Sequence, residues 1–284
     1  MNGKKPEGEG YSRITPTAFG VTKLRAYSDI PYAEAVLKEI QGMPEVDDQI
    51  VYPPERAPQI EARYKLVDRM IAKSQVRQIL ELASGLTMRG LAMTQDSEVE
   101  YVELDLPEMV TTKESLLRAV LSGDSQPPNL HIESGNALNV EDISKVARYF
   151  KPEPVTVIHE GLLRYLNFSE KTTVARNVRS VLKRFGGVWI TPDITLKSVL
   201  AVDNSQAPGQ NQVIDSIVGR TIADNAFESV DAAQQFFESL GFTVEPHPLT
   251  EVIDDLSSPK KLGLNRKEVK RSLGEVTVFV MHIV

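Results

Sequence analysis

The chain contains no cysteine and only four histidines among its 284 residues. The absence of cysteine excludes a disulfide framework, a thiolate metal site and a cysteine nucleophile. The four histidines are scattered and do not follow the spacing of metal ligands, so we expect no metal site.

Long apolar runs are also absent, and none approaches the ~18 residues that a membrane span requires. The net charge of −7 argues against nucleic-acid binding through a basic surface. Residues 1–10 are charged and rich in glycine without the apolar core of a signal peptide, so we expect a disordered leader. These features favour a soluble cytoplasmic protein with a small-molecule partner, and they do not indicate the oligomeric state.

The stretch from Gln78 to Gly90 is the most informative part of the chain. Its apolar run at 78–82 ends in Ala83-Ser84-Gly85, which is typical of a buried parallel strand followed by a tight turn and a helix. Small residues let a ligand approach the backbone, and the N–H groups of such a turn suit a polar or anionic cofactor. Taken alone, the same pattern also fits an ordinary turn between strand and helix.

A second predicted strand, residues 99–106, carries two acidic side chains, Glu103 and Asp105. An acid at the tip of this strand, about 20 positions after the turn, commonly binds ribose hydroxyls. Both acids qualify, and Asp105 lies nearer the strand end. Because a strand buried on both faces tolerates carboxylates only near its exposed end, we expect neither acid to be structural.

Two further strands, residues 130–133 and 154–158, are closely followed by polar residues. Asn136 follows the first of them and is either a neighbour of the cofactor base or a turn residue. His159 and Glu160 follow the second, at the edge of the sheet where ligands bind in open α/β folds.

The remaining pattern predicts a fifth strand at 188–193 and an interruption at 195–229, which we interpret as a substrate-covering insertion. A helix at 230–240, a strand at 242–245 and a long β-rich run at 275–284 follow, and 249–273 is expected to be irregular. We therefore predict a Rossmann-like α/β domain over residues 61–284. Its sheet is doubly wound and seven-stranded with an antiparallel last strand, and a helical cap precedes it at 11–60.

Three motifs, at 81–89, 101–107 and 160–166, resemble the leucine carboxyl methyltransferase family of class I S-adenosylmethionine-dependent methyltransferases. That family includes bacterial O-methyltransferases of polyketide pathways. The resemblance implies an O-methyltransferase that uses S-adenosyl-L-methionine and acts on a carboxylate or hydroxyl of a small, polyketide-like acceptor.

The resemblance also implies roles for individual residues. Arg63 meets the carboxylate of the cofactor's methionine part, and Asp105 holds the ribose hydroxyls. The other predicted cofactor-binding residues are Glu81 and Leu106 in the same motifs, the turn residues Ala83, Ser84 and Gly85, Asn136 and Ala137 beside the adenine, and Glu160 near the methionine amino group.

The sequence departs from the family pattern at three positions. Ala83 replaces a glycine, Thr87 replaces an aspartate, and Asn136 replaces an aspartate. Alanine costs little clearance, and asparagine still accepts a hydrogen bond from the adenine amino group. We therefore expect cofactor binding to be retained.

His159 and Tyr165 are the candidate catalytic residues. A carboxylate acceptor is ionised at neutral pH and needs no base, whereas a phenol would need one, and His159 is the nearest candidate. A structural histidine satisfied by hydrogen bonds is the favoured alternative, and Tyr165 is as readily a core residue as an acceptor contact.

Two other functions stay open at this point. An NAD-dependent oxidoreductase would share the turn and the acid of the second strand, although the full Gly-x-Gly-x-x-Gly pattern is missing. A non-catalytic S-adenosylmethionine-binding protein would keep the fold without turnover.

Overall fold

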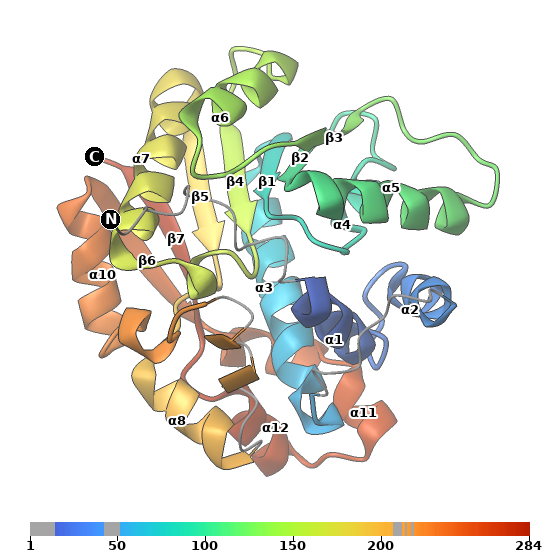
Figure 1. Ribbon diagram of the computed structural model, residues 1–284, viewed down its shortest axis with the longest axis vertical. Coiled ribbons are helices and arrows are strands. Elements are labelled where there is room, and N and C mark those ends of the chain that lie inside the picture. Colours follow the sequence, from blue (N-terminus) through green and yellow to red (C-terminus); the bar gives the residue numbers. More distant parts are fainter. Residues whose placement is uncertain (1–14, 43–51, 207–211, 214, 217–218) are drawn as a thin grey trace, which may run out of the picture.

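The computed structural model describes residues 15–42, 52–206, 212–213, 215–216 and 219–284. One central sheet is covered by helices on both faces (Figure 1). The predicted leader, residues 1–10, lies outside the described residues, as do parts of the predicted cap and insertion.

The sheet has seven strands in the order β3-β2-β1-β4-β5-β7-β6. The first five strands pair in parallel, and β7 lies antiparallel between β5 and β6. This confirms the predicted doubly wound sheet with an antiparallel last strand. The strands are β1 (Gln78–Leu82), β2 (Glu100–Asp105), β3 (Leu130–Ser134), β4 (Val155–His159), β5 (Gly187–Thr191), β6 (Phe242–Pro248) and β7 (Thr277–Ile283).

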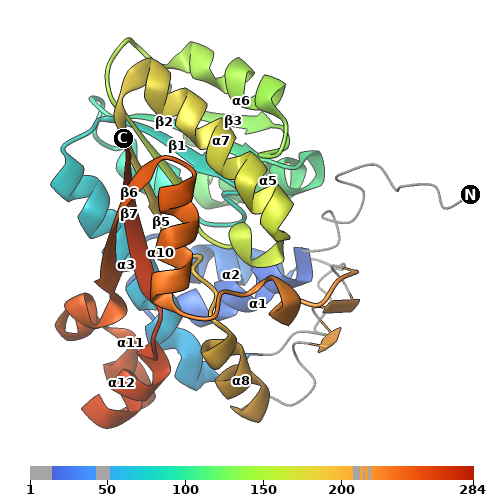
Figure 2. The ribbon, with the colours of Figure 1, turned by 90° about the vertical axis from the view of Figure 1, so that its left-hand side faces the viewer.

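The central strands are apolar on both faces because each face is covered by helices. Ile79 and Tyr101 pack on one face and Leu80 and Val102 on the other, as the period of two along a strand requires. The first face is covered by α2 (Ala33–Gln41), α3 (Ala57–Ser74), α4 (Arg89–Met93), α5 (Pro107–Leu121) and α12 (Arg266–Leu273). The second is covered by α6 (Val140–Val146), α7 (Phe168–Phe185) and α10 (Val230–Ser239), of which α7 and α10 face the viewer in Figure 2.

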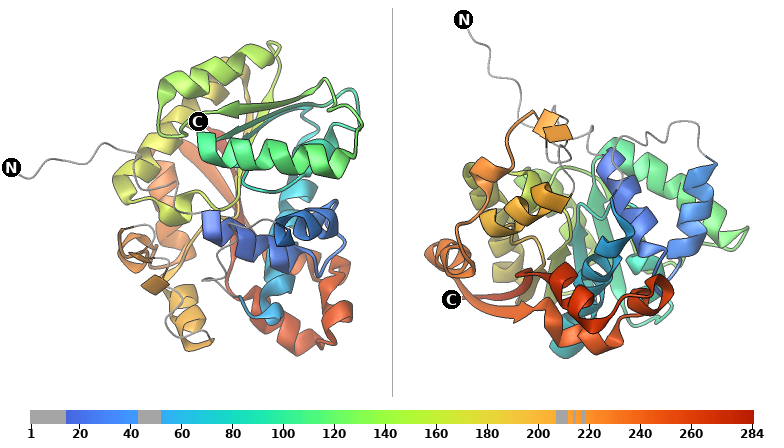
Figure 3. Two further views of the ribbon diagram at one scale, coloured as in Figure 1. Left: turned by 45° about the vertical axis from the view of Figure 1, so that its right-hand side comes forward. Right: turned by 90° about the horizontal axis from the view of Figure 1, so that it is seen from below.

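The N-terminal helix α1 (Thr15–Arg25) packs against α2 and α3. Figure 3 shows α1 and α2 beside α5, on the side of the sheet toward which the parallel strands point. Between 195 and 229 the chain forms α8 (Lys197–Gln206) and a 3-10 turn, η5 (Ala223–Asn225), and Leu196 pairs with Phe227. The remaining short 3-10 turns are η2 (Pro54–Arg56), η3 (Ala147–Tyr149) and η4 (Leu163–Tyr165).

Two expectations about helices are corrected. The run from Ile30 to Ile40, with Pro31 in its first turn, predicts one helix, but α2 begins at Ala33, because Tyr32 adopts a left-handed conformation (φ 63°) that ends the preceding turn. The segment 249–273 is largely helical rather than irregular, with η6 (Leu249–Asp255), α11 (Ser258–Leu262) and α12. Asn265 and Glu268 form a capping box at the start of α12, so the signal was present in the sequence.

Among the helices that the structure describes, none is both long and apolar enough to cross a membrane.

Candidate functional site

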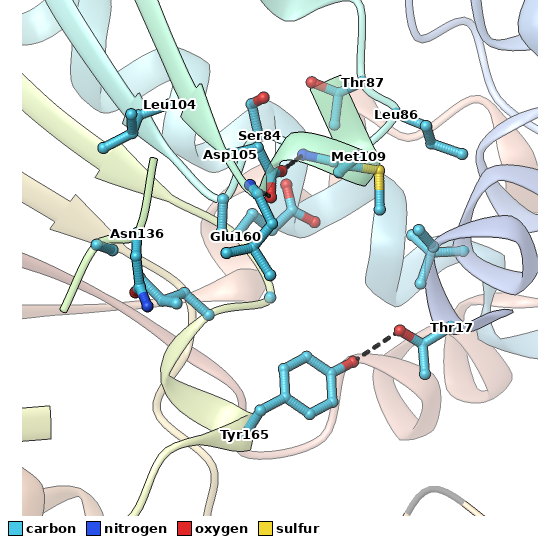
Figure 4. A pocket seen from close by; sticks show the side chains of 18 of the residues that line it. Thr17, Ser84, Leu86, Thr87, Leu104, Asp105, Met109, Asn136, Glu160 and Tyr165 are labelled. Atoms are coloured by element: carbon cyan, nitrogen blue, oxygen red, sulfur yellow. Dashed lines mark hydrogen bonds between the residues drawn. The ribbon is translucent and has the colours of Figure 1, made fainter. Parts of the chain in front are cut away.

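A cavity of about 150 Å³ lies beyond the carboxyl ends of β1, β2 and β4. Its wall combines the turn after β1, the ends of β2 and β3, the loop after β4, and α1 (Figure 4). This is the edge at which ligands bind in doubly wound sheets. The lining residues are Thr17, Ala18, Val21, Arg25, residues 83–87, residues 104–106, Glu108, Met109, residues 135–138, residues 160–162, Tyr165 and Leu166.

The turn after β1 is held by the carboxylate of Asp105. Asp105 accepts hydrogen bonds from the backbone N–H groups of Gly85 and Leu106, each at 2.7 Å. Burial raises the pKa of Asp105 above its ordinary value, although these two donors oppose the shift. In Figure 4 the Asp105 side chain lies on the strand-end side of the cavity, across the open space from Tyr165 and Thr17.

Ala83 adopts a left-handed backbone conformation with φ 51°. This is where the family pattern has a glycine, and glycine reaches the conformation without a Cβ penalty. Alanine at this position therefore introduces backbone strain and also reduces the space available to a ligand.

Asn136 and Ala137 lie in the loop after β3 and line the cavity, where the sequence predicted them. The side-chain oxygen of Asn136 accepts a hydrogen bond from the backbone N–H of Leu138 at 2.9 Å. The backbone N–H of Asn136 donates to the carboxylate of Asp142. Asn136 is thus a turn residue and a neighbour of the cavity, so the two interpretations of this residue are compatible.

Glu160 is buried among three arginines. Its carboxylate lies 3.3 Å from Arg25, 3.6 Å from Arg63 and 3.3 Å from Arg89. Burial by itself would raise the pKa of Glu160, but the three positive charges outweigh it and lower the pKa. Glu160 therefore stays ionised at the edge of the cavity.

Asp193, at the end of β5, fixes the loop that carries Glu160. It accepts hydrogen bonds from the N–H groups of residues 161–163 at 2.6–3.2 Å and from Arg63 at 2.9 Å. No sequence motif marks Asp193, because its loop partners lie some 30 residues earlier along the chain and Arg63 lies 130 residues earlier.

Three predicted site residues do not line the cavity. Glu81 lies beneath it and accepts hydrogen bonds from Arg89 and Tyr101, each at 2.8 Å. Arg63 lines a separate cavity of about 70 Å³ on the other side of the Glu160 cluster. The side chain of His159 is fully buried, with Nδ1 3.0 Å from Asp193 and 3.1 Å from Thr191. Their cofactor or catalytic roles stay predictions.

The expectation that neither acid of β2 is structural is wrong for Glu103. This residue is buried and forms an ion pair with Lys113 of α5, which is also buried. A buried carboxylate is tolerated in mid-strand when a cation pairs with it.

Sequence reasoning missed Arg25 and Thr17, both supplied by α1. Arg25 lines the cavity, and its Nε is buried without a hydrogen-bond partner in the described part of the chain. Thr17 accepts a hydrogen bond from the hydroxyl of Tyr165 at 3.1 Å, which joins α1 to the loop after β4 (Figure 4). No motif marks these positions, because only the packing of α1 brings them to the cavity.

The lining is chemically suited to S-adenosylmethionine. Asp105 offers a carboxylate to a pair of hydroxyls, Asn136 offers an amide to a base, and Glu160 offers a carboxylate to an ammonium group. Arg25 is one of the lining residues, and its guanidinium is a group that suits a carboxylate. In the described residues, no group of three or more histidine, aspartate and glutamate side chains is arranged to hold a metal.

Two solved structures share the fold at low sequence identity. A DUF574 family protein from Streptomyces avermitilis MA-4680 is 12% identical with a TM-score of 0.53, and the match covers 94% of this chain and 96% of that one. A candidate methyltransferase from Thermobifida fusca YX is 14% identical with a TM-score of 0.53, covering 93% of this chain and 94% of that one. The sequence matches none of the curated proteins.

The family model for leucine carboxyl methyltransferase matches residues 23–179, more than half of the chain. The match includes the turn after β1, Asp105, Asn136 and Glu160, and it favours methyl transfer over the NAD-dependent oxidation that the sequence left open. The chain therefore belongs to the leucine carboxyl methyltransferase family and is an S-adenosylmethionine-dependent methyltransferase.

Proposed function

We propose that this enzyme methylates an oxygen of a small organic acceptor, and that the preferred oxygen belongs to a carboxylate. The observation that carries the proposal is the set of titratable side chains around the cavity. Among the residues that the structure describes, the lining contains neither histidine nor lysine, and its ionisable members are Arg25, Asp105, Glu108, Glu160 and Tyr165.

None of the buried carboxylates in this set is suited to removing a proton from the acceptor. Asp105 already accepts hydrogen bonds from two backbone N–H groups. The ionised carboxylate of Glu160 is paired with three arginines. An acceptor that is ionised at neutral pH needs no such base. A carboxylic acid meets this condition, whereas an aliphatic hydroxyl or a phenol does not.

The cofactor would be held by the polar groups of the cavity. Asp105 would bind the ribose hydroxyls, the loop at Asn136 and Ala137 would border the adenine, and Arg25 and Glu160 would bind the carboxylate and the amino group of the methionine part. When bound, S-adenosylmethionine supplies a methyl group activated by its sulfonium. The chain's own residues then have to orient the acceptor and exclude water.

The acceptor-facing side is formed by α1 and the loop after β4. Ala18, Val21, Leu162 and Leu166 make it mainly apolar, and the paired hydroxyls of Tyr165 and Thr17 provide its polar contact. This composition supports an acceptor with an apolar body, such as a polyketide-like acid. We propose Tyr165 as an acceptor contact rather than as a base.

Binding and turnover are tested separately. Calorimetric titration should show that S-adenosylmethionine and S-adenosylhomocysteine bind the purified chain. Label from the S-methyl group should then be transferred to aliphatic or aromatic carboxylic acids in preference to phenols. A methyl ester releases the label as methanol in alkali, whereas a methyl ether retains it. Alkali-stable label on phenols alone would overturn the preference for a carboxylate.

Asp105→Ala should weaken the affinity for S-adenosylhomocysteine more than tenfold. The change removes a charged acceptor from two hydroxyl donors, at about 1.5–3 kcal/mol for hydrogen bonds to charged groups. Asp124→Ala, which removes an exposed acid, serves as the matched control and should leave the affinity unchanged. Equal affinities of the two variants would remove Asp105 from the cofactor site.

A further inference from the structure

Lys171, in the first turn of α7, is a fully buried cation outside the cavity. Only 1% of its surface is exposed, and it belongs to the largest fully buried side chains of the described residues. Lysine is rarely buried to this extent without partners, because removing its charge from water is costly. Burial lowers the pKa of Lys171 to about 8, opposed by the nearby charges of Glu170 and Asp193 and reinforced by that of Arg220.

The ammonium group connects two segments that are distant in the sequence. Nζ donates hydrogen bonds to the backbone carbonyl of Leu166 and, at 2.8 Å, to the backbone carbonyl of Asn225. The rings of Phe168 and Phe227, which pack edge to face against each other, lie next to this connection, with centroids 5.1 Å and 5.9 Å from Nζ. An apolar side chain of similar length would fill the same space but would leave both carbonyls without this donor.

The two connected segments differ in their relation to the cavity. Leu166 ends the loop 160–166, which supplies Glu160, Leu162 and Tyr165 to the lining. Asn225 lies in η5, and no residue of 222–227 lines the cavity. Ile222 and Ala226 instead pack in a small cluster with Leu200 and, at its edge, Tyr165. Lys171 therefore ties a segment beside the cavity to the loop that forms its wall.

A second contact reinforces this connection one residue earlier on α7. Arg220 forms an ion pair with Glu170 through both carboxylate oxygens. Glu170 also completes the capping box of α7 with Asn167. The first turn of α7 thus holds the segment 220–227 at two points, and the Lys171 contact also reaches the cavity loop.

We propose that Lys171 is a positioning residue that couples segment 222–227 to loop 160–166, so that occupancy of the cavity stabilises a segment that does not touch it. The coupling is reciprocal: order imposed on one segment lowers the free energy of ordering the other. The proposal rests on the proposed function only in using a cofactor-type ligand to fill the cavity.

Hydrogen exchange of the full chain, followed by mass spectrometry, tests the connection without any ligand. In Lys171→Met, the amides of 161–166 and 222–227 should both exchange about tenfold faster than in the wild type, because the shared donor is lost. Lys183→Met makes the same change at an exposed position of the same helix and should leave both segments unchanged. Lys171→Arg keeps a charged donor and should restore much of the protection.

Addition of S-adenosylhomocysteine tests the coupling itself. In the wild type it should slow exchange in 161–166 and also in 222–227. In Lys171→Met it should slow exchange in 161–166 alone, a difference that general destabilisation would not produce. Protection of 222–227 in both proteins would assign the coupling to the packing of Tyr165 and overturn the proposal.

The two proposals fail in different ways. If calorimetry detects no binding of S-adenosylhomocysteine, the proposed cofactor site fails, while the ligand-free comparison still decides the role of Lys171. If Lys171→Met does not fold, Lys171→Arg and the ligand response of the wild type carry the test. An absence of ligand-induced protection at 222–227 in a wild type that binds the ligand contradicts the coupling.

Discussion

The two walls of the cavity are built in different ways. The strand-end wall, residues 83–87, 104–106 and 135–138, follows three adjacent parallel strands, and the side-chain oxygens of Asp105 and Asn136 fix its turns by accepting hydrogen bonds from backbone N–H groups. The helical wall consists of the α1 residues Thr17, Ala18, Val21 and Arg25 together with Tyr165 and Leu166. Side-chain contacts between segments nearly 150 residues apart hold this second wall, as between Tyr165 and Thr17.

This difference accompanies the proposed division of the site, in which the strand-end wall binds the cofactor and the helical wall, apart from Arg25, faces the acceptor. The turns of the strand-end wall directly follow the ends of the strands, so the fold constrains which residues can occupy them. The helical wall depends on elements that can change without altering the sheet, as is common for binding residues carried by a rigid scaffold. The helical wall should therefore determine acceptor choice.

The largest effect is expected from the ion cluster beneath the strand-end wall. Arg89 is fully buried and pairs with Glu81, Asp68 and Glu160. Arg89→Met should lower the free energy of unfolding by about 3–5 kcal/mol, because it leaves buried carboxylates without their cation. Urea denaturation measures this loss. As the control, Arg77→Met removes an exposed arginine with a surface partner and should lower the free energy of unfolding by about 1 kcal/mol or less. Similar losses of stability in both variants would mean that the cluster is not needed to support this wall.

The second prediction asks which arginine serves the cofactor. Arg25→Met should weaken the binding of S-adenosylhomocysteine about tenfold or more, since it removes a charged donor worth about 1.5–3 kcal/mol from the cavity. Arg63→Met should have a smaller effect, because Arg63 lies in the neighbouring cavity and donates to Asp193. Calorimetry with adenosine, which lacks the amino-acid part, is the control and should not distinguish Arg25→Met from the wild type. The reverse order of the two variants would restore Arg63 to the role that the sequence predicted.

The third prediction concerns the pH dependence that Lys171 adds next to the helical wall. Burial lowers the pKa of Lys171 from 10.5 to about 8 in the folded chain. Between pH 8 and pH 10.5 this lysine is therefore mostly protonated in the unfolded chain and mostly neutral in the folded chain. The burial penalty is present in full below pH 8, and the free energy of unfolding rises as the pH increases from 8 toward 10.5. Relative to Lys171→Met, the wild type should gain on the order of 1–2 kcal/mol between pH 8 and pH 10. Parallel urea titrations of the two proteins measure the gain, and a constant difference would contradict it.

The smallest effect is expected at the turn of the strand-end wall. Ala83→Gly should raise the free energy of unfolding by at most about 1 kcal/mol, because glycine adopts the left-handed conformation of this position without strain. Thermal unfolding is a sufficient measurement. A lower stability of the variant would mean that the methyl group of Ala83 contributes packing that exceeds the backbone strain.

Much of the strand-end wall could be predicted because its signals are local. The small residues after β1, the acid at the end of β2 and the asparagine after β3 each follow a short apolar run within a few positions. The order of these units along the chain, with two terminal strands after five alternating units, also predicted the sheet. Even the capping box of α12 was readable, although its segment was predicted to be irregular.

The sequence was least informative about residues whose partners are distant along the chain. Glu103 lies two positions before Asp105 on the same face of β2 and has the same charge. The ion pair with Lys113 of α5 is what makes Glu103 a structural residue. His159 is the last residue of β4, at the ligand edge, yet Asp193 and Thr191 hold its ring within the core. Arg25 has no motif at all, and it reaches the cavity because α1 packs across α3.

The sequence by itself determined the sheet, its order of strands and the strand-end wall, because periodicity, turn residues and motif order act over short distances along the chain. The tertiary structure decided which charges pair, which arginine faces the cavity and how Lys171 joins two segments. Those outcomes depend on side chains meeting across separate elements, where burial makes each charge favourable only beside a particular partner.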